Sequence, residues 1–236
     1  MENVDCKLQI AQNAALLLLA AITIAIAQES PTPTPMPTPT PTPSTTPTRN
    51  VRLSFVPPPM QGTISLGVFD TNGKLVRILH REAKIDSFTV NADSLNTTWD
   101  GTNDAGEDLP PGKYRAHGYL VAHLKVEDLG KATGPSPKET ADHVSVKLVI
   151  NPLVSDTRSV VDLGVGIDKD GSYLKMMDGL PLCAVSETPN LIRVLITKNG
   201  ERSVDVWQDD GAVIERFRVS NIDKMMAFDC GDFELK

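Results

Sequence analysis

The stretch Thr97–Arg115, TTWDGTNDAGEDLPPGKYR, gathers side chains that could do chemistry, since it holds four acidic residues, three glycines and a tryptophan. Clustered carboxylates are the ligands that calcium prefers. Counted from Asp100, however, the glycine and the bidentate glutamate of an EF-hand loop would fall on Ala105 and Pro111. The spacing therefore favours turn formation, with weak and irregular calcium binding as the alternative.

The other residue types used in catalysis show no pattern that points to a reaction. The four histidines are His80, His117, His123 and His143. A Ser-His-Asp site needs a nucleophile on a strained turn, and the chain contains no G-x-S-x-G motif. His117 alternates with Tyr114 and Ala116 in an expected strand, so we expect its side chain to face solvent, and we expect His80 to end a strand. We predict no catalytic residues.

Cofactor and metal motifs are equally weak. The segment GVGIDKDG at 164–171 has two close glycines but lacks the G-x-G-x-x-G pattern and a following helix, so we expect Asp168–Gly171 to form a hairpin turn, with metal binding as the alternative. Cys183 and Cys230 could pair in an oxidising compartment, or they could be two separate buried thiols. No closely spaced Cys or His pairs resemble a zinc-ligand set. We therefore predict no metal and no cofactor.

After residue 50, short segments in which apolar and polar residues alternate are separated by turn-forming residues, and this pattern predicts strands. VRLSF at 51–55 and TISLGVFD at 63–70 each place apolar residues on one face. The DTNGK turn that follows contains Gly73, whose freedom to take a positive φ suits a tight hairpin. Trp99 ends another expected strand and is predicted to fill the core, because aromatic side chains bury the most area. The sequence predicts an all-β fold.

The same turns carry a family resemblance. The hairpin at 68–77, the Trp99-Asp100-Gly101 triplet, Asp104-x-Gly106 and Pro111-Gly112-x-Tyr114 resemble the immunoglobulin-like domain of the flagellar hook-capping protein, the FlgD-like Ig domain. The resemblance covers about 70 residues and implies an Ig-like β-sandwich. The segment Asp86–Ser94 departs from it, because the family places an Ala-Gly turn before the Trp-Asp-Gly strand and this chain has a longer stretch without it.

The second half also reads as strands. After a Pro/Gly/Ser-rich loop at 132–140 comes the alternating HVSVKLVIN, followed by five strand-like runs that end in a clear hairpin around Asp210-Gly211. The 79 residues from 158 to 236 are too few for a closed propeller, which needs at least about four blades of roughly 40–45 residues. The region could be a small sandwich, an extension packed on the Ig domain, or the truncated start of a longer protein.

The N-terminal part does not read as folded. The apolar run AALLLLAAITIAIA at 14–27 has the length of a signal-peptide core and ends in Ala25-Ile26-Ala27, so cleavage before Gln28 is expected, with an uncleaved membrane anchor as the competitor. The Thr/Pro-rich tract that follows favours extended polyproline II and predicts a semi-rigid spacer.

These features predict an Ig-like β-sandwich followed by a second small β region. The expected parts are a signal peptide at 1–27, a linker at 28–50, a FlgD-like Ig domain at 51–125, a loop and connecting strand at 126–157, and the second β region at 158–236, which is either a complete or an incomplete domain.

The formal net charge of −7, with no basic patch, argues against nucleic acid as a partner. We expect a non-enzymatic, secreted, periplasmic or cell-surface protein with a structural or adhesive role, whose partner is a protein or a cell-surface polymer. It would contact a membrane only if the signal segment stays uncleaved. The alternative is an accessory Ig-like domain of a secreted enzyme or carbohydrate-binding protein, whose active part is the C-terminal region or is missing by truncation. A concave cluster of aromatics or carboxylates in residues 158–236 would favour that alternative.

Overall fold

The computed structural model describes residues 49–153 and 159–236, all of which belong to one compact unit, residues 45–236. The predicted signal peptide and most of the predicted spacer lie outside the described residues. Fifteen strands and one 3-10 helix, η1 (Ile85–Ser87), make up the described secondary structure, and these residues include no α-helix. The prediction of an all-β fold is confirmed.

Two antiparallel sheets form a first sandwich. One has the order β1-β5-β4 and the other the order β15-β6-β2-β3. Their strands are β1 (Val51–Phe55), β5 (Leu95–Trp99), β4 (Thr89–Val90), β15 (Met225–Leu235), β6 (Gly112–Val121), β2 (Thr63–Phe69) and β3 (Leu75–Ala83). The core between them is rich in aromatic rings: Phe55, Phe88, Trp99, Tyr114 and Phe228 are all buried there.

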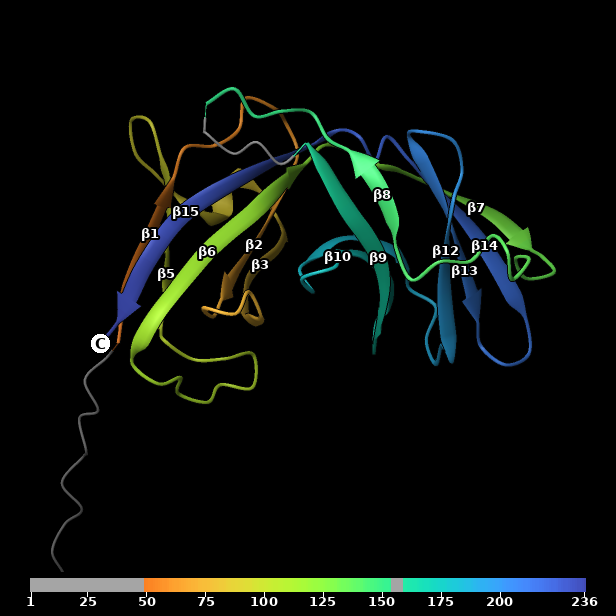
Figure 1. The fold of residues 1–236 in the computed structure, drawn as a ribbon, viewed down its shortest axis with the longest axis horizontal. Coiled ribbons are helices and arrows are strands. Elements are labelled where there is room, and N and C mark those ends of the chain that lie inside the picture. Colours follow the sequence, from red (N-terminus) through yellow and green to blue (C-terminus); the bar gives the residue numbers. More distant parts are fainter. Residues whose placement is uncertain (1–48, 154–158) are drawn as a thin grey trace, which may run out of the picture. The chain divides into compact units, whose positions relative to one another are not determined.

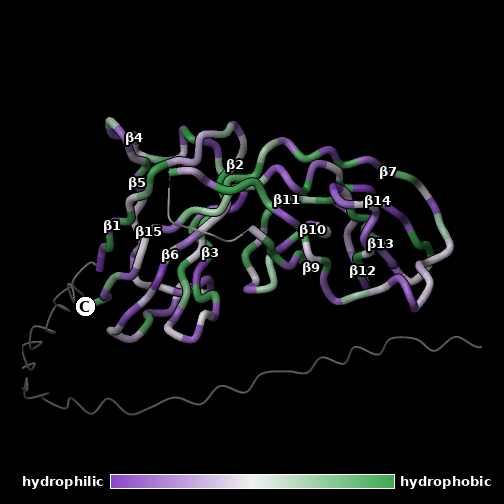
Figure 2. The backbone as a smooth tube through the Cα atoms, turned by 45° about the horizontal axis from the view of Figure 1, so that its top comes forward, coloured by the Kyte–Doolittle hydropathy of each residue, from purple (hydrophilic) through white to green (hydrophobic). Residues whose placement is uncertain are grey.

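Two further antiparallel sheets form a second sandwich, with the orders β11-β10-β9-β8 and β12-β13-β14-β7. Their strands are β11 (Pro181–Ser186), β10 (Gly171–Met176), β9 (Val160–Asp168), β8 (Val144–Lys147), β12 (Arg193–Lys198), β13 (Ser203–Asp209), β14 (Ile214–Ser220) and β7 (Lys125–Lys131). Its core is mainly aliphatic. Figure 2 shows hydrophobic and hydrophilic residues alternating along many of the strands, as expected for sheets that bury one face.

The last strand returns to the first sandwich. β15 pairs with β6 along its length, from Met225 opposite Val121 to Leu235 opposite Gly112. Figure 1 shows the two strands side by side, although more than a hundred residues separate them in the chain. The structure thus places residues 225–235 with the first sandwich and strands β7 and β8 with the second, whereas the sequence assigned 225–235 to the second region and treated 126–157 as a connection. Alternation locates strands but does not say which strand is the neighbour of which.

The hairpin turns form as their residue types predict. Between β2 and β3, Asp70 Oδ1 accepts hydrogen bonds from the backbone N–H groups of Asn72 and Lys74, both at 2.9 Å, and Gly73 has a φ of +77°. The predicted turns at Asp168–Gly171 and Asp210-Gly211 likewise join β9 to β10 and β13 to β14. Side chains that satisfy nearby backbone donors and a glycine at positive φ therefore set these corners.

The sheet containing β2 is buried on both faces. Ile64, Leu66 and Val68 point into the core of the first sandwich, as the alternation predicts. Phe69 on the same strand and Tyr119 on β6 belong to the core of the second sandwich. This sheet therefore separates two hydrophobic cores, which one-sided alternation does not reveal.

Candidate functional site

Trp99, the most conspicuous residue of the carboxylate-rich stretch, is a core residue. Its side chain is 1% exposed, and its indole Nε1 donates a hydrogen bond of 2.9 Å to the carbonyl oxygen of Thr102. The ring meets Tyr114 edge-on, with the centroids 5.2 Å apart. The predicted role in the core is confirmed.

The acidic and amide groups beside Trp99 satisfy the backbone of their own turns. Asp100 Oδ1 accepts bonds from the N–H and the hydroxyl of Thr102, at 3.0 and 2.8 Å, and the hydroxyl bond is the main reason that the pKa of Asp100 lies below its ordinary value. Asn103 Oδ1 accepts the N–H groups of Ala105 and Glu107, each at 2.9 Å. These oxygens take part in turn formation, the role that the spacing favoured.

Asp104 has a further task at a sheet edge. β3 is the outer strand of its sheet, and Asp104 Oδ1 accepts the backbone N–H of Ile78 on that strand at 2.8 Å. Unpaired edge groups can recruit other strands. The turn carboxylate therefore satisfies a donor that β3 would otherwise leave open.

Two of the four histidines, His80 and His117, make contacts within the fold. His80 lies within β3 rather than at its end, its Nε2 is 2.8 Å from the hydroxyl of Thr97, and burial lowers its pKa. The expectation that His117 faces solvent is wrong. Its side chain is 13% exposed, its ring is stacked on Phe69 with centroids 3.8 Å apart, and its Nε2 is 3.2 Å from Asp178 Oδ2. The outward face of β6 is covered by the second sandwich, so the side chain that alternation directs outward is still enclosed. His123 and His143 are exposed.

The two cysteines of the described chain are separate thiols. Cys183 lies on β11 and Cys230 on β15, and both are half-buried. Burial raises the pKa of each thiol to about 12. The thiolate is the nucleophilic form of cysteine, so both groups are held in the unreactive state.

The Asp168–Gly171 turn ties the two sandwiches together. Asp168 Oδ2 accepts a bond of 2.6 Å from Arg81 Nη1, and this bond is the main cause of its lowered pKa. Arg81 also lies over the ring of Tyr173, 4.5 Å from its centroid. Within residues 49–153 and 159–236, no group of three or more His, Cys, Asp or Glu is placed to hold a metal ion.

Sequence reasoning did not identify the element that positions Arg81, a bulge in β3. The register of β3 against β2 shifts between Ile64 and Leu66, so two residues of β3, Arg81 and Glu82, stand opposite Ser65. Glu82 takes a positive φ of 49°, and its carboxylate accepts the backbone N–H of Ala184 on β11 at 3.0 Å. The bulge therefore turns two adjacent charged residues toward the second sandwich.

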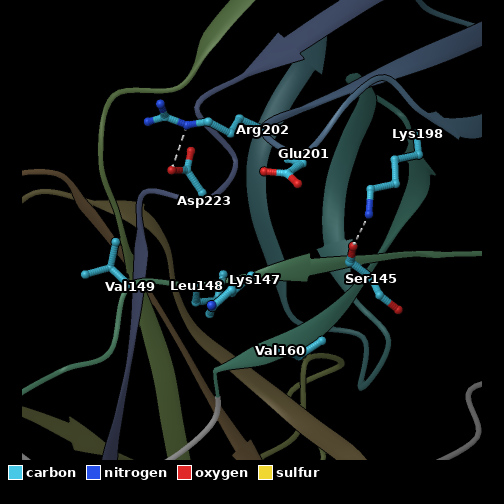
Figure 3. Close-up of a pocket in the computed structure, with 9 residues that line it drawn as sticks. All are labelled: Ser145, Lys147, Leu148, Val149, Val160, Lys198, Glu201, Arg202 and Asp223. Carbon is cyan, nitrogen blue, oxygen red and sulfur yellow. Dashed lines mark hydrogen bonds and ion pairs between the residues drawn. The ribbon is translucent and has the colours of Figure 1, made fainter.

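A cleft of about 770 Å³ opens in the second sandwich (Figure 3). Charges of both signs line it: Arg202 Nε is paired with Asp223 Oδ2 at 2.9 Å, and Lys198 Nζ donates to the carbonyl oxygen of Ser145 at 3.3 Å. Lys147 and Glu201 add one further charge of each sign. The lining residues in the described part of the chain include no aromatic side chain, and one of their two carboxylates, that of Asp223, is already paired. This lining does not match the aromatic or carboxylate cluster that would favour the alternative.

A second pocket, of about 480 Å³, lies against the β1-β5-β4 sheet, and the described residues that line it all carry polar side chains. Arg52 of β1 stands opposite Thr98 of β5, and Asn96 of β5 stands opposite Thr89 of β4. Residues directly opposite each other share a face, so hydroxyl, amide and guanidinium groups gather on the outward side of this sheet. Ser87 of η1 adds a hydroxyl from the segment that connects β3 to β4.

This pocket was not anticipated from the sequence. Asn96 is 5% exposed although it is on the outward face, and its Oδ1 accepts a bond of 3.2 Å from Arg52 Nε. Asn96 Nδ2 lies 3.4 Å from both the carbonyl oxygen of Thr89 and the hydroxyl of Ser94. The sequence did mark the segment 86–94 as longer than the resemblance to the Ig-like family implies. Ser87 and Thr89 of this segment form part of the pocket wall.

Comparisons of the chain with models of protein families, with curated proteins and with solved structures find no match. A search of the described residues for membrane-spanning segments finds no helix with the length and apolar character to cross a bilayer.

Proposed function

We propose that this chain is a non-enzymatic protein that is exported and carried on its Thr/Pro-rich spacer, with a structural or adhesive role at or outside the cell envelope. The proposal keeps the FlgD-like Ig domain as the identity of the first sandwich. It rests first on the structural contacts made by the residue types that could do chemistry. Hydrogen bonds within the fold engage carboxylates of the Trp99 corner and two of the four histidines, and both thiols are half-buried.

The observation that carries the proposal is the insertion of the second sandwich between β6 and β15. The chain leaves the first sandwich at Val121 and returns at Met225, which stands directly opposite. At the other end of these strands, a methyl group on Gly101 would lie 3.0 Å from Leu235 and 3.3 Å from Arg49, so Arg49 and Leu235 lie at one corner of the described unit. A unit held at one corner leaves the surfaces away from that corner accessible, which suits a displayed module.

Export can be tested directly with the full-length chain in a bacterial host. We expect the exported protein to begin at or near Gln28 and to be accessible to protease added to intact cells. Mass spectrometry that finds an intact Met1 in a cytoplasmic protein would contradict the proposal.

Adhesion and catalysis can be separated in a second experiment. The exported protein should sediment with envelope fragments without releasing soluble sugars or peptides from them. Release of products that increases with time would favour the accessory role in a secreted enzyme instead.

A further inference from the structure

We propose that the polar pocket of the β1-β5-β4 sheet binds an acidic sugar unit of an envelope polysaccharide, with its carboxylate on Arg52 and its hydroxyls on the neighbouring side chains. The inference rests on the proposed function and names the class of surface polymer that this protein contacts.

Arg52 is held in a way that presents its charge outward. Its Nε donates to the buried Asn96 Oδ1, which fixes the orientation of the planar guanidinium. No ion pair or further hydrogen bond engages the two terminal nitrogens within the described residues. A guanidinium fixed in this way offers two parallel N–H donors, the geometry that matches a carboxylate.

The groups around Arg52 suit the rest of a sugar ring. The hydroxyls of Thr98, Thr89 and Ser87 line the same pocket as Arg52, and each of these residues is exposed. Hydroxyls both donate and accept hydrogen bonds, so they can pair with sugar hydroxyls in either direction. Strands β1 and β5 fix two of these positions by their register, which limits the conformational cost of binding.

The charge of the whole chain makes a local site necessary. The net charge of −7 repels an acidic polymer over the surface in general, so attraction must come from specific positions. Arg52 differs in this respect from Arg202 in the other cleft, whose charge is already balanced by Asp223 at 2.9 Å. Arg52 therefore keeps a guanidinium that no described carboxylate balances, in a pocket lined by hydroxyl and amide groups.

The position of Arg52 in the chain suggests which polymer is within reach. It is two residues beyond the end of the Thr/Pro-rich tract at Asn50, or about 7 Å of extended chain. On the proposed function the spacer carries this sandwich at or outside the cell envelope, so an acidic polysaccharide of the envelope is the polymer of matching charge.

Binding of polygalacturonate to the purified full-length protein tests the inference, with dextran as the neutral sugar polymer and polyglutamate as a carboxylate polymer without sugar hydroxyls. We expect measurable affinity for polygalacturonate only. Arg52→Gln should weaken it at least about tenfold, the effect of one lost charged hydrogen-bond pair, and Arg52→Lys should weaken it less. Thr98→Val should weaken it by a smaller factor.

Lys147→Ala is the matched control, because it removes a cation from the cleft of the second sandwich. It should leave the affinity unchanged, and all variants should keep the melting temperature of the parent. Equal binding to polyglutamate or dextran, or a loss with Lys147→Ala but not with Arg52→Gln, would overturn the inference. These results do not depend on export, so they are separate from a failure of the proposed function.

Discussion

The two sandwiches are built from strands that meet in different ways. In the second, neighbours in the sheet are mostly neighbours in the chain, since β8 to β11 follow one another and β12 to β14 do the same. In the first sandwich, the four-stranded sheet is complete only when the edge strand β15 pairs with β6. β15 follows the whole second sandwich in the chain. Local pairing forms with less loss of chain entropy than distant pairing. The difference indicates that the inserted sandwich can fold early, whereas the first must wait for the last strand.

Each sandwich carries one tryptophan, so the unfolding of each can be followed separately by fluorescence. Trp99 lies in the first core, and Trp207 on β13 donates its indole N–H to the Thr197 hydroxyl at 3.0 Å. A Trp207→Phe background reports the first sandwich, and a Trp99→Phe background reports the second.

The largest expected effect comes from ending the chain after Ala227. This removes Phe228 and Leu235, which are buried only in the first core, and keeps Met225 and Ala227, which are buried in the second. The loss of most of a paired strand should exceed the roughly 5–15 kcal/mol that holds a typical domain together. We expect Trp99 to become solvent-exposed in emission while Trp207 keeps a cooperative transition. Retention of native Trp99 emission would show that β15 is dispensable.

The next largest effect is the difference in unfolding free energy between a core variant, at Trp99, and a turn variant, at Asp104. Trp99→Ala should cost about 3–5 kcal/mol of unfolding free energy, as for other buried aromatics. Asp104→Ala should cost about 1 kcal/mol or less, because it removes one hydrogen bond at an exposed edge. Chemical denaturation of each variant measures both values. A midpoint that scarcely moves for Trp99→Ala would contradict its place in the core.

A smaller effect compares matched hairpins of the two sandwiches. Gly73 has a φ of +77° and Gly211 a φ of +89°, so valine at either position should cost about 1–2 kcal/mol in backbone strain. A side chain at Gly73 would meet no atom within 4 Å, and one at Gly211 would meet only the end of the exposed Ile192. We expect Gly73→Val to lower the Trp99 transition and Gly211→Val the Trp207 transition. Gly73→Asn, which tolerates positive φ, is the control.

The smallest effect is a dependence on pH in the first sandwich. Burial lowers the pKa of His80 in the folded state, so the unfolded chain binds its proton more readily. The stability from neutral His80 is present above the ordinary pKa of about 6.5 and is lost as the pH falls toward the lowered value. We expect the Trp99 midpoint to fall between pH 7 and pH 5, and His80→Gln to flatten that fall. An equal fall in the variant would assign it to other groups.

How much the sequence predicts depends on how local the cause is. The turn around Gly73 and the core position of Trp99 follow from neighbouring residues, and both are confirmed. The pairing of β15 with β6 was not foreseen, because alternation carries no information about distant partners. His117 was misplaced because its sheet has a core on each side, and Asn96 was overlooked because its burial depends on Arg52 and on the segment that covers it.

The end of β6 lies beside the start of β15, and this proximity makes the inserted sandwich removable by design. The backbone N–H of Ala122 bonds the carbonyl oxygen of Lys224 at 3.0 Å, so the two strands already approach as closely as the arms of a hairpin. An Asn-Gly turn could join them directly and excise about a hundred residues without altering the register. Phe69, Tyr119 and Val121 would then face water and would need polar replacements. The same junction could accept an unrelated domain, which makes the first sandwich an adaptable carrier.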